Sequence, residues 1–291
     1  MDVIAAMKIT AFLLSLGLGS LLASAAAPGT GASFTGPVGL QLYSLRGIAT
    51  QNPPKALKQT KDFGLTLVET AGTYTLPPTK FKALLDLHNL KPISGHFPYD
   101  RWKNEPEKVL AEAKAIGLQY AGCAWINHKA PFNEAAARDA IATFNKAGEL
   151  GAKEGIKVFY HAHGFEFHQL GDGTLMDLLI IETNPKHVSF QMDVLWVVFP
   201  GQDPVHWLKK YPGRWELMHL KDLKKGVKTG DLSGKTDVSN DVPLGTGQMD
   251  WPAILKAAKE SGVKYYFIED ESPTVVEQIP QTLKFLESVK F

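Results

Sequence analysis

The feature that most constrains this chain is a repeated alternation between short apolar runs and amphipathic stretches of helical length, beginning near residue 38. Eight such cycles can be counted along the sequence. Repeated strand-then-helix units build a parallel sheet, and eight of them close into a ring, so the sequence predicts an α/β fold made of a single (β/α)8 barrel. The predicted strands are residues 38–44, 65–70, 91–96, 120–125, 157–163, 188–193, 215–221 and 264–269.

The stretches between these runs include helical segments with apolar residues at i, i+3 and i+4 spacing. They are residues 53–63, 105–116, 134–153, 174–182, 251–261 and 275–289. Glycines close several of them directly before the next strand, where helix C-caps are expected. These glycines are Gly64, Gly117, Gly155 and Gly262.

The first thirty residues have the layout of a secretory signal peptide. Lys8 precedes an apolar run over residues 9–23, and small residues follow it. The alternative is an uncleaved membrane anchor, but this apolar run is shorter than the roughly 20 residues that span a bilayer. We therefore expect residues 1–30 to be a signal peptide cleaved near residues 25–27, residues 31–291 to form the barrel, and the mature protein to be secreted or periplasmic, with no membrane attachment.

Length and charge narrow the functional classes. A chain of 291 residues that is 44% hydrophobic can bury one large core. Lys and Arg number 31 against 30 for Asp and Glu, so no strong field collects nucleic acid or anionic membrane. A small neutral or weakly charged ligand fits better. The single cysteine, Cys123, forms no intramolecular disulfide and is expected to be a small buried hydrophobe.

One irregular stretch, residues 222–249, is too long and polar for an idle connection in a compact barrel. It follows the seventh predicted strand, so it is expected over the catalytic face, as a lid or substrate-binding loop. The alternative is a disordered surface insertion.

The carboxyl ends of the strands form the active site in such barrels, and here these ends are unusually polar. Three or four carboxylates that converge on one mouth repel one another unless a cation neutralises them. A ligand set made mostly of oxygen atoms with one imidazole is typical of Mn²⁺, Co²⁺ or Mg²⁺, whereas structural zinc sites are rich in sulfur. We predict one divalent ion, Mn, Co, Mg or Zn. The polar residues at or just beyond the strand ends are Glu69, His96, His161, His163, Glu166, Asp193, His219, Lys221 and Glu269.

Five motifs resemble the xylose-isomerase-like sugar phosphate isomerase/epimerase superfamily of TIM barrels, in a secreted subgroup. They are YHAHGFEF (residues 160–167), QMDVLW (191–196), HLKD (219–222), PLGTGQMDW (243–251) and IED (268–270). The resemblance covers essentially the whole mature chain.

This resemblance implies one metal held by a Glu, Asp, His, Glu quartet, placed on Glu166, Asp193, His219 and Glu269. The 26-residue interval from Asp193 to His219 is one βα unit, which agrees with equivalent strand ends. The first ligand is open. Many relatives carry that Glu on strand five, where this chain has His161 and His163, so either Glu166 reaches in from the loop or His163 is the ligand.

Each assignment has a structural alternative. Asp193 is also placed to cap the following helix, His219 to be a satisfied core histidine, and Glu269 to belong to a solvated acidic turn. Lys221 either holds a substrate oxygen or forms an ion pair with Asp222 or Glu69.

The remaining polar and aromatic residues are assigned to substrate and proton transfer. His161 and His163 share a face by the period of two and are candidates for a general base and a substrate contact. Glu69 and His96 are expected to contact substrate. Trp125, Trp196 and Tyr43 are expected to form apolar walls for a sugar ring, although aromatic residues there also serve as core.

We therefore expect a divalent-metal-dependent sugar isomerase or epimerase that acts on a keto-sugar through an enediolate, with Glu166 and Glu269 as base and acid. An alternative fate of the same enolate is β-elimination, which would make the protein a 3-keto-glycoside lyase or hydratase. A non-catalytic sugar-binding barrel is a further alternative. Abasic-site endonuclease activity is opposed by the balanced charge and the export signal. The expected partner is a small sugar, and a homo-oligomer is compatible with the sequence.

Overall fold

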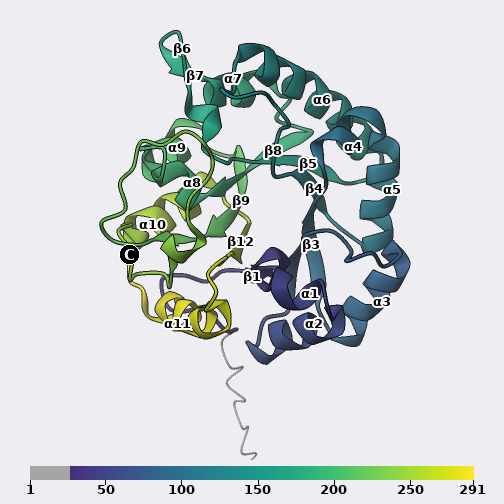
Figure 1. Ribbon diagram of the computed structural model, residues 1–291, viewed down its shortest axis with the longest axis vertical. Helices are drawn as coiled ribbons and strands as arrows, with labels where there is room; N and C mark the ends of the chain where they lie inside the picture. The colour runs from purple at the N-terminus through teal and green to yellow at the C-terminus, as the bar shows by residue number, and fades with distance from the viewer. Residues whose placement is uncertain (1–26) are drawn as a thin grey trace, which may run out of the picture.

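The computed structural model describes residues 27–291 and contains a closed barrel of eight parallel strands, as the alternation predicts. Most of the predicted signal peptide therefore lies outside the described residues. Helices surround the barrel, with α2 to α7 around one side and α9 to α11 around the other (Figure 1). The strands, in their order around the ring, are β1 (Val38–Gln41), β12 (Tyr265–Ile268), β9 (Trp215–Leu220), β8 (Val188–Asp193), β5 (Lys157–His161), β4 (Tyr120–Cys123), β3 (Lys91–His96) and β2 (Leu67–Thr70).

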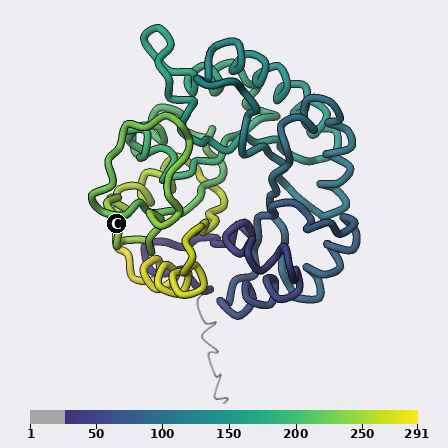
Figure 2. The backbone as a smooth tube through the Cα atoms, viewed as in Figure 1, coloured from purple at the N-terminus to yellow at the C-terminus, as the bar shows by residue number. Residues whose placement is uncertain are grey.

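The chain runs once around the ring, so its first and last described segments meet (Figure 2). Pairing of β1 with β12 closes the barrel in parallel register, with Gly39 beside Phe267. All eight predicted strands are present. The first was predicted to continue to Ser44, but it ends at Gln41, whose side chain accepts a hydrogen bond from the amide of Tyr43 and begins a 3-10 turn over Leu42–Leu45.

The helices begin and end where the sequence carries capping residues. Asn133 caps α6, and Thr174 and Asp177 form a capping box on α7. Gly117 and Gly262 end α5 and α10 in the left-handed conformation. The helices are α1 (Arg46–Ala49), α2 (Pro53–Asp62), α3 (Pro78–Leu87), α4 (Tyr99–Asn104), α5 (Pro106–Ile116), α6 (Glu134–Lys153), α7 (Leu175–Glu182), α8 (Val194–Val198), α9 (Pro204–Lys210), α10 (Trp251–Ser261) and α11 (Val275–Ser288).

Apolar side chains fill the interior of the barrel between its two ends. A buried cluster of Ile93, Tyr120, Phe159, Leu217 and Phe267, all on barrel strands, is distinct from the larger core that includes the surrounding helices. Such a filled interior leaves the carboxyl ends of the strands as the place for a site. Cys123 is buried and free, as expected. Within residues 27–291, no helix combines the length and apolarity needed to cross a membrane.

The segment 222–249 is attached to the barrel at both ends. Its first residues form β10 (Asp222–Leu223), which pairs with β11 (Asp241–Val242). Gly234, between them, is buried against the carbonyl of His163 and the rings of Phe165 and Trp125. The segment thus reaches the turn that follows β5, at the carboxyl end of the barrel, which is where the sequence placed it.

Candidate metal centre and active site

Three of the four predicted ligands meet at the mouth of the barrel. Asp193 ends β8, His219 lies near the end of β9, and Glu269 directly follows β12. His219 Nδ1 lies 3.1 Å from Glu269 Oε2 and 3.5 Å from Asp193 Oδ2. One ligand atom from each residue lies within 4.8 Å of the others, and all three residues are buried.

His219 is oriented by a carboxylate behind it. Its Nε2 lies 2.5 Å from Glu69 Oε1, which leaves Nδ1 directed at Asp193 and Glu269. Burial alone would lower the pKa of His219, but the charges of Glu269 and Glu69 hold it well above its ordinary value. A carboxylate on the far nitrogen is the usual support of a metal-binding histidine.

The two carboxylate oxygens of Asp193 differ in their hydrogen bonds. Its Oδ1 accepts hydrogen bonds from the amides of Leu195 and Trp196, so the helix-cap alternative is true of that atom. Its Oδ2 is buried and accepts no hydrogen bond within the described residues. Burial is the main reason why the pKa of Asp193 is raised. An unpartnered buried carboxylate oxygen beside a second carboxylate is costly without a cation.

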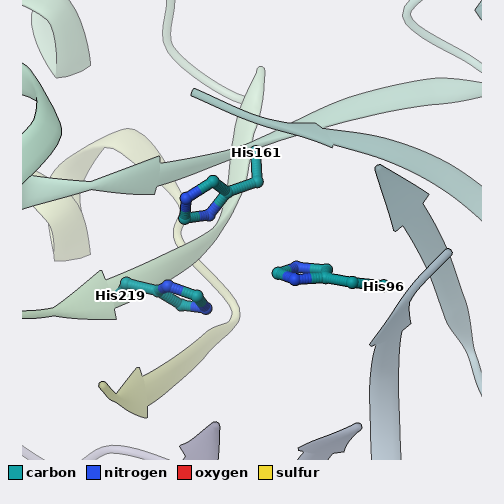
Figure 3. Close-up of side chains that lie close together, drawn as sticks. All are labelled: His96, His161 and His219. Carbon is teal, nitrogen blue, oxygen red and sulfur yellow. The ribbon is translucent and has the colours of Figure 1, made fainter. Parts of the chain in front are cut away.

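His161 stands beside this group at the end of β5. Its Nε2 is 3.9 Å from Asp193 Oδ2, and its Nδ1 is 3.0 Å from Gln191 Oε1. Burial, followed by the charges of His219 and His163, lowers its pKa well below the ordinary value. Figure 3 shows its ring beside those of His219 and His96, which come from different strands. His161 is thus a neutral imidazole with a nitrogen facing the cluster.

Glu166 is not part of the cluster, so the prediction that it is a metal ligand and proton carrier at the mouth needs correction. Its carboxylate accepts hydrogen bonds from the backbone amides of His163 and Gly164 and from the hydroxyl of Tyr160. It is fully buried, and burial raises its pKa to about 7. Glu166 holds the turn after β5 together.

Glu69 also lies below the site. Its oxygens bind Gln41, Ser94, Gln191 and His219, and no part of its side chain is exposed. Burial opposes ionisation, but the charges of His96 and His219 and these hydrogen bonds lower its pKa to about 2. Glu69 was predicted to contact substrate, but its buried carboxylate instead holds His219 in place.

Gln191 was not predicted as a site residue. Its Oε1 lies 3.0 Å from His96 Nε2 and 3.0 Å from His161 Nδ1, while its Nε2 donates to Glu69. The one sequence indication was its position two residues before Asp193 on the same strand, which places both on one face.

Lys221 pairs with residues other than those predicted. Its Nζ lies 2.6 Å from Glu271 Oε1, 3.4 Å from Glu269 Oε2 and 3.6 Å from Asp241 Oδ2. The expected partners Asp222 and Glu69 are engaged elsewhere: Asp222 accepts hydrogen bonds from the amides of the 222–249 segment. Burial would lower the pKa of Lys221, but the surrounding carboxylates, led by Glu269 and Asp241, raise it well above its usual range.

A cavity of about 580 Å³ opens above the cluster. Its size falls within the range of small-molecule sites. No Arg or Lys side chain belongs to its described lining. Tyr43, His96, Trp125, His161, His163, Glu269 and Glu271 line it, so most of the predicted contacts are brought together, while Trp196 lies to one side with the ring of His163 stacked on it at 4.7 Å.

Residues 57–289 match a family model described as xylose isomerase-like TIM barrel. The chain belongs to this family. An inosose dehydratase from Clostridium beijerinckii is 26% identical over 260 residues, which are 78% of this chain and 85% of that protein. Other bacterial inosose dehydratases match over about half of their own length.

Solved structures agree with the family assignment. A sugar phosphate isomerase/epimerase from Parabacteroides distasonis superimposes with a TM-score of 0.73 at 25% identity, covering 91% of this chain and 96% of that one. A protein called IOLI, whose structure has a bound zinc atom, superimposes with a TM-score of 0.64 at 14% identity and covers 86% of this chain and 95% of its own.

The donor set of this xylose isomerase-like barrel fits a divalent cation. Two buried carboxylates and the Nδ1 atom of His219 lie close together, and Asp193 Oδ2 has no hydrogen-bond partner among residues 27–291. Hard oxygen donors with imidazole suit Mn²⁺, Co²⁺, Mg²⁺ or Zn²⁺.

Proposed function

We propose that this barrel is a metal-dependent lyase or dehydratase that acts on a keto-sugar by β-elimination. The observation that carries the proposal is the position of Glu166, whose carboxylate is held in the turn by backbone amides and away from the mouth. The predicted isomerase or epimerase chemistry used Glu166 and Glu269 as two carboxylates on either side of the reacting carbon. With Glu166 away from the mouth, the cavity is lined by His96, His161 and His163 beside Glu269 and Glu271. Lys221 lines the adjoining cavity.

Asp193, His219 and Glu269 would hold the cation, with His161 as the fourth ligand. The zinc atom in the similar IOLI barrel supports a bound cation in this fold, and the choice of ligands rests on the geometry of these residues. When bound, a divalent cation polarises a ketone and acidifies the adjacent C–H.

His163 is placed to take that proton. It lines the cavity, and its Nδ1 is buried without a hydrogen-bond partner in the described chain. Burial, with the charge of Lys221, lowers its pKa to about 3, so the imidazole is neutral in the free protein. A pKa this low also makes it a weak base, so acidification of the C–H by the cation would have to supply most of the driving force.

Lys221 is placed to complete the elimination. As the C–O bond β to the ketone breaks, the departing oxygen takes up the bonding pair and then a proton. Lys221 is protonated, and an alkoxide is a far stronger base than its amine, so this transfer is favourable. The products are an unsaturated ketone and water or an alcohol.

The substrate we propose is unphosphorylated. A phosphate group is commonly paired with Arg or Lys, and within the described residues the lining of the 580 Å³ cavity, where the keto-sugar ring would bind, has neither. Export through the predicted signal peptide supports the same choice, and is itself part of the proposal.

Product analysis tests the function. Purified protein with Mn²⁺ is incubated with methyl 3-keto-glucoside and, separately, with a keto-inositol, and the products are followed by NMR in D₂O. We expect release of methanol or water with formation of an unsaturated ketone, lost in Asp193→Ala. Deuterium exchange that yields only an isomer, without loss of the β-oxygen, would exclude elimination.

That second outcome would support the alternative, an isomerase or epimerase. The observation in its favour is the likeness to the P. distasonis sugar phosphate isomerase/epimerase over 91% of this chain.

A further inference from the structure

A second cavity of about 320 Å³ lies beside the first, and we call it the outer chamber. His163 and Glu271 line both cavities, so the two are adjacent. Most of the remaining lining comes from segment 222–249, including Thr236, Val238 and Asp241. The reaction at the metal centre uses none of these three side chains.

The lining of the outer chamber is polar and balanced in charge. Lys221, Lys235, Thr236, Asp241 and Glu271 line it, and Lys221 Nζ lies 2.6 Å from Glu271 Oε1 and 3.6 Å from Asp241 Oδ2. Lysines donate hydrogen bonds, carboxylates accept them and a hydroxyl does both. Such a set suits an uncharged ligand with many hydroxyl groups. A flat aromatic group is less well served, because Trp196 is only 5% exposed and His163 already stacks on its ring.

The order of groups along the two cavities fits a substrate with two parts. His163 stands at the wall shared by the cavities, and Lys221 lines the outer chamber with its Nζ 3.4 Å from Glu269 Oε2. A keto-sugar ring above the metal centre would therefore direct its departing oxygen towards Lys221. Whatever that oxygen carries would enter the outer chamber.

We propose that the outer chamber binds a second sugar ring, so that the substrate is a keto-disaccharide or a longer keto-glycoside. This rests on the proposed function, because the second ring is the leaving group of the elimination. Segment 222–249 then acts as the specificity loop for that ring.

The test fills the outer chamber. Val238 is 40% exposed and lines it, so Val238→Trp narrows the chamber while the core is left intact. Val276→Trp is the matched control: this valine is 38% exposed and lines a different cavity, of about 310 Å³. Specificity constants are measured for methyl 3-keto-glucosides and for the 3-keto derivatives of maltose and cellobiose.

We expect the wild type to prefer a keto-disaccharide over the methyl compound by about tenfold or more. Val238→Trp should reduce that preference at least fivefold, and Val276→Trp should keep it. Equal preferences in all three proteins would overturn the proposal. So would a p-nitrophenyl 3-keto-glucoside that shows the same preference and the same loss, since the chamber would then bind an aromatic group.

A binding measurement separates this proposal from the proposed function. Maltose, cellobiose and methyl glucoside lack the ketone and cannot eliminate, so calorimetric titration reports binding alone. If no keto-glycoside is cleaved, the proposed function fails. The outer chamber still stands if a disaccharide binds more tightly than methyl glucoside and Val238→Trp removes the difference, and it falls if their affinities are equal.

Discussion

One uncharged residue, Gln191, determines how two histidines at the site carry their protons. Its Oε1 is only an acceptor, so His96 Nε2 and His161 Nδ1 must each donate to it. The lone pair of His161 Nε2 then faces Asp193 Oδ2, 3.9 Å away. The amide thereby leaves Nε2 of His161 available for the fourth-ligand role that we propose, although the amide itself does not line the cavity.

Replacing this amide should weaken metal binding. Gln191→Leu removes the acceptor that fixes His161, and we expect the affinity for Mn²⁺ to fall by about 10- to 100-fold, the usual effect of losing such a supporting contact. Competition with a fluorescent chelator measures it. Gln119→Leu, the same change beside the start of β4, should keep wild-type affinity; equal affinity in both variants would refute the role of Gln191.

Glu166 should contribute a pH dependence to stability. Its pKa rises from 4.5 to about 7 on burial, so the folded state holds the proton more tightly and its stability falls as pH rises between those values. Glu166→Gln lacks this loss. The free energy of unfolding of the wild type, relative to Glu166→Gln, should drop by at most about 3 kcal/mol over this range, as measured by urea titration. A constant difference would contradict it.

The site residues differ in how far the sequence could predict them. Asp193, His219 and Glu269 lie at or directly after the ends of apolar strands, and barrel geometry brings such positions together. Glu166 lies beyond its strand, in a turn whose backbone amides bind its carboxylate. The alternation of residues along a strand does not predict where a side chain in such a turn points. Gln191 was missed because the sequence argument relied on the free-energy cost of burying charged groups, and an amide carries no charge.

At the scale of elements, the alternation of strands and helices could be read almost completely, because each barrel strand is a buried apolar run. The ends were harder. The run 38–44 looks like one strand, but the Gln41 side chain caps a turn at Leu42 and stops it. The helices α8 (Val194–Val198) and α9 (Pro204–Lys210) have too few turns to show a period.

Segment 222–249 depends on a close approach at its return to the barrel. Asp222 accepts hydrogen bonds from the amides of Gly245 and Gly247, and a Cβ at Gly247 would collide with Asp222 and with the carbonyl of Leu223. We expect Gly247→Ala to lower the free energy of unfolding by about 1–3 kcal/mol through overpacking.

The matched control is Gly47→Ala. An added methyl group there meets nothing within 4 Å, and the residue is helical, so stability should be unchanged or slightly higher. Chemical denaturation compares the two variants. Equal stability of Gly247→Ala and wild type would show that the return of the segment is not tightly packed.

The two ends of the barrel have different roles: buried charges at the amino end stabilise the fold, and the candidate site lies at the carboxyl end. At the amino end of the barrel, buried Glu216 pairs with Lys157, and its Oε2 lies 2.8 Å from both Lys264 Nζ and the Tyr120 hydroxyl. Burial opposes ionisation, but the lysines lower the pKa of Glu216. These buried charges contribute to the stability of the fold, as expected for the end opposite the site.

Glu216→Ala should therefore lower the free energy of unfolding by about 3 kcal/mol, because it leaves a partly buried lysine unpaired. Its specificity constant and its metal content should match the wild type. Chemical denaturation measures the loss of stability, and steady-state kinetics at a temperature where both proteins are folded measures the specificity constant. A large loss of activity in the folded variant would contradict this difference in roles.

We propose that histidine and carboxylate groups at the strand ends, without Glu166, hold one divalent cation. The direct measurement is elemental analysis of the wild type and of Asp193→Ala, His219→Ala and Glu166→Gln after exposure to Mn²⁺, Co²⁺, Mg²⁺ or Zn²⁺ and desalting. We expect about one ion per chain in the wild type and in Glu166→Gln, and none in the other two. A folded wild type that stays empty with every metal, or a Glu166→Gln variant as empty as Asp193→Ala, would contradict the account.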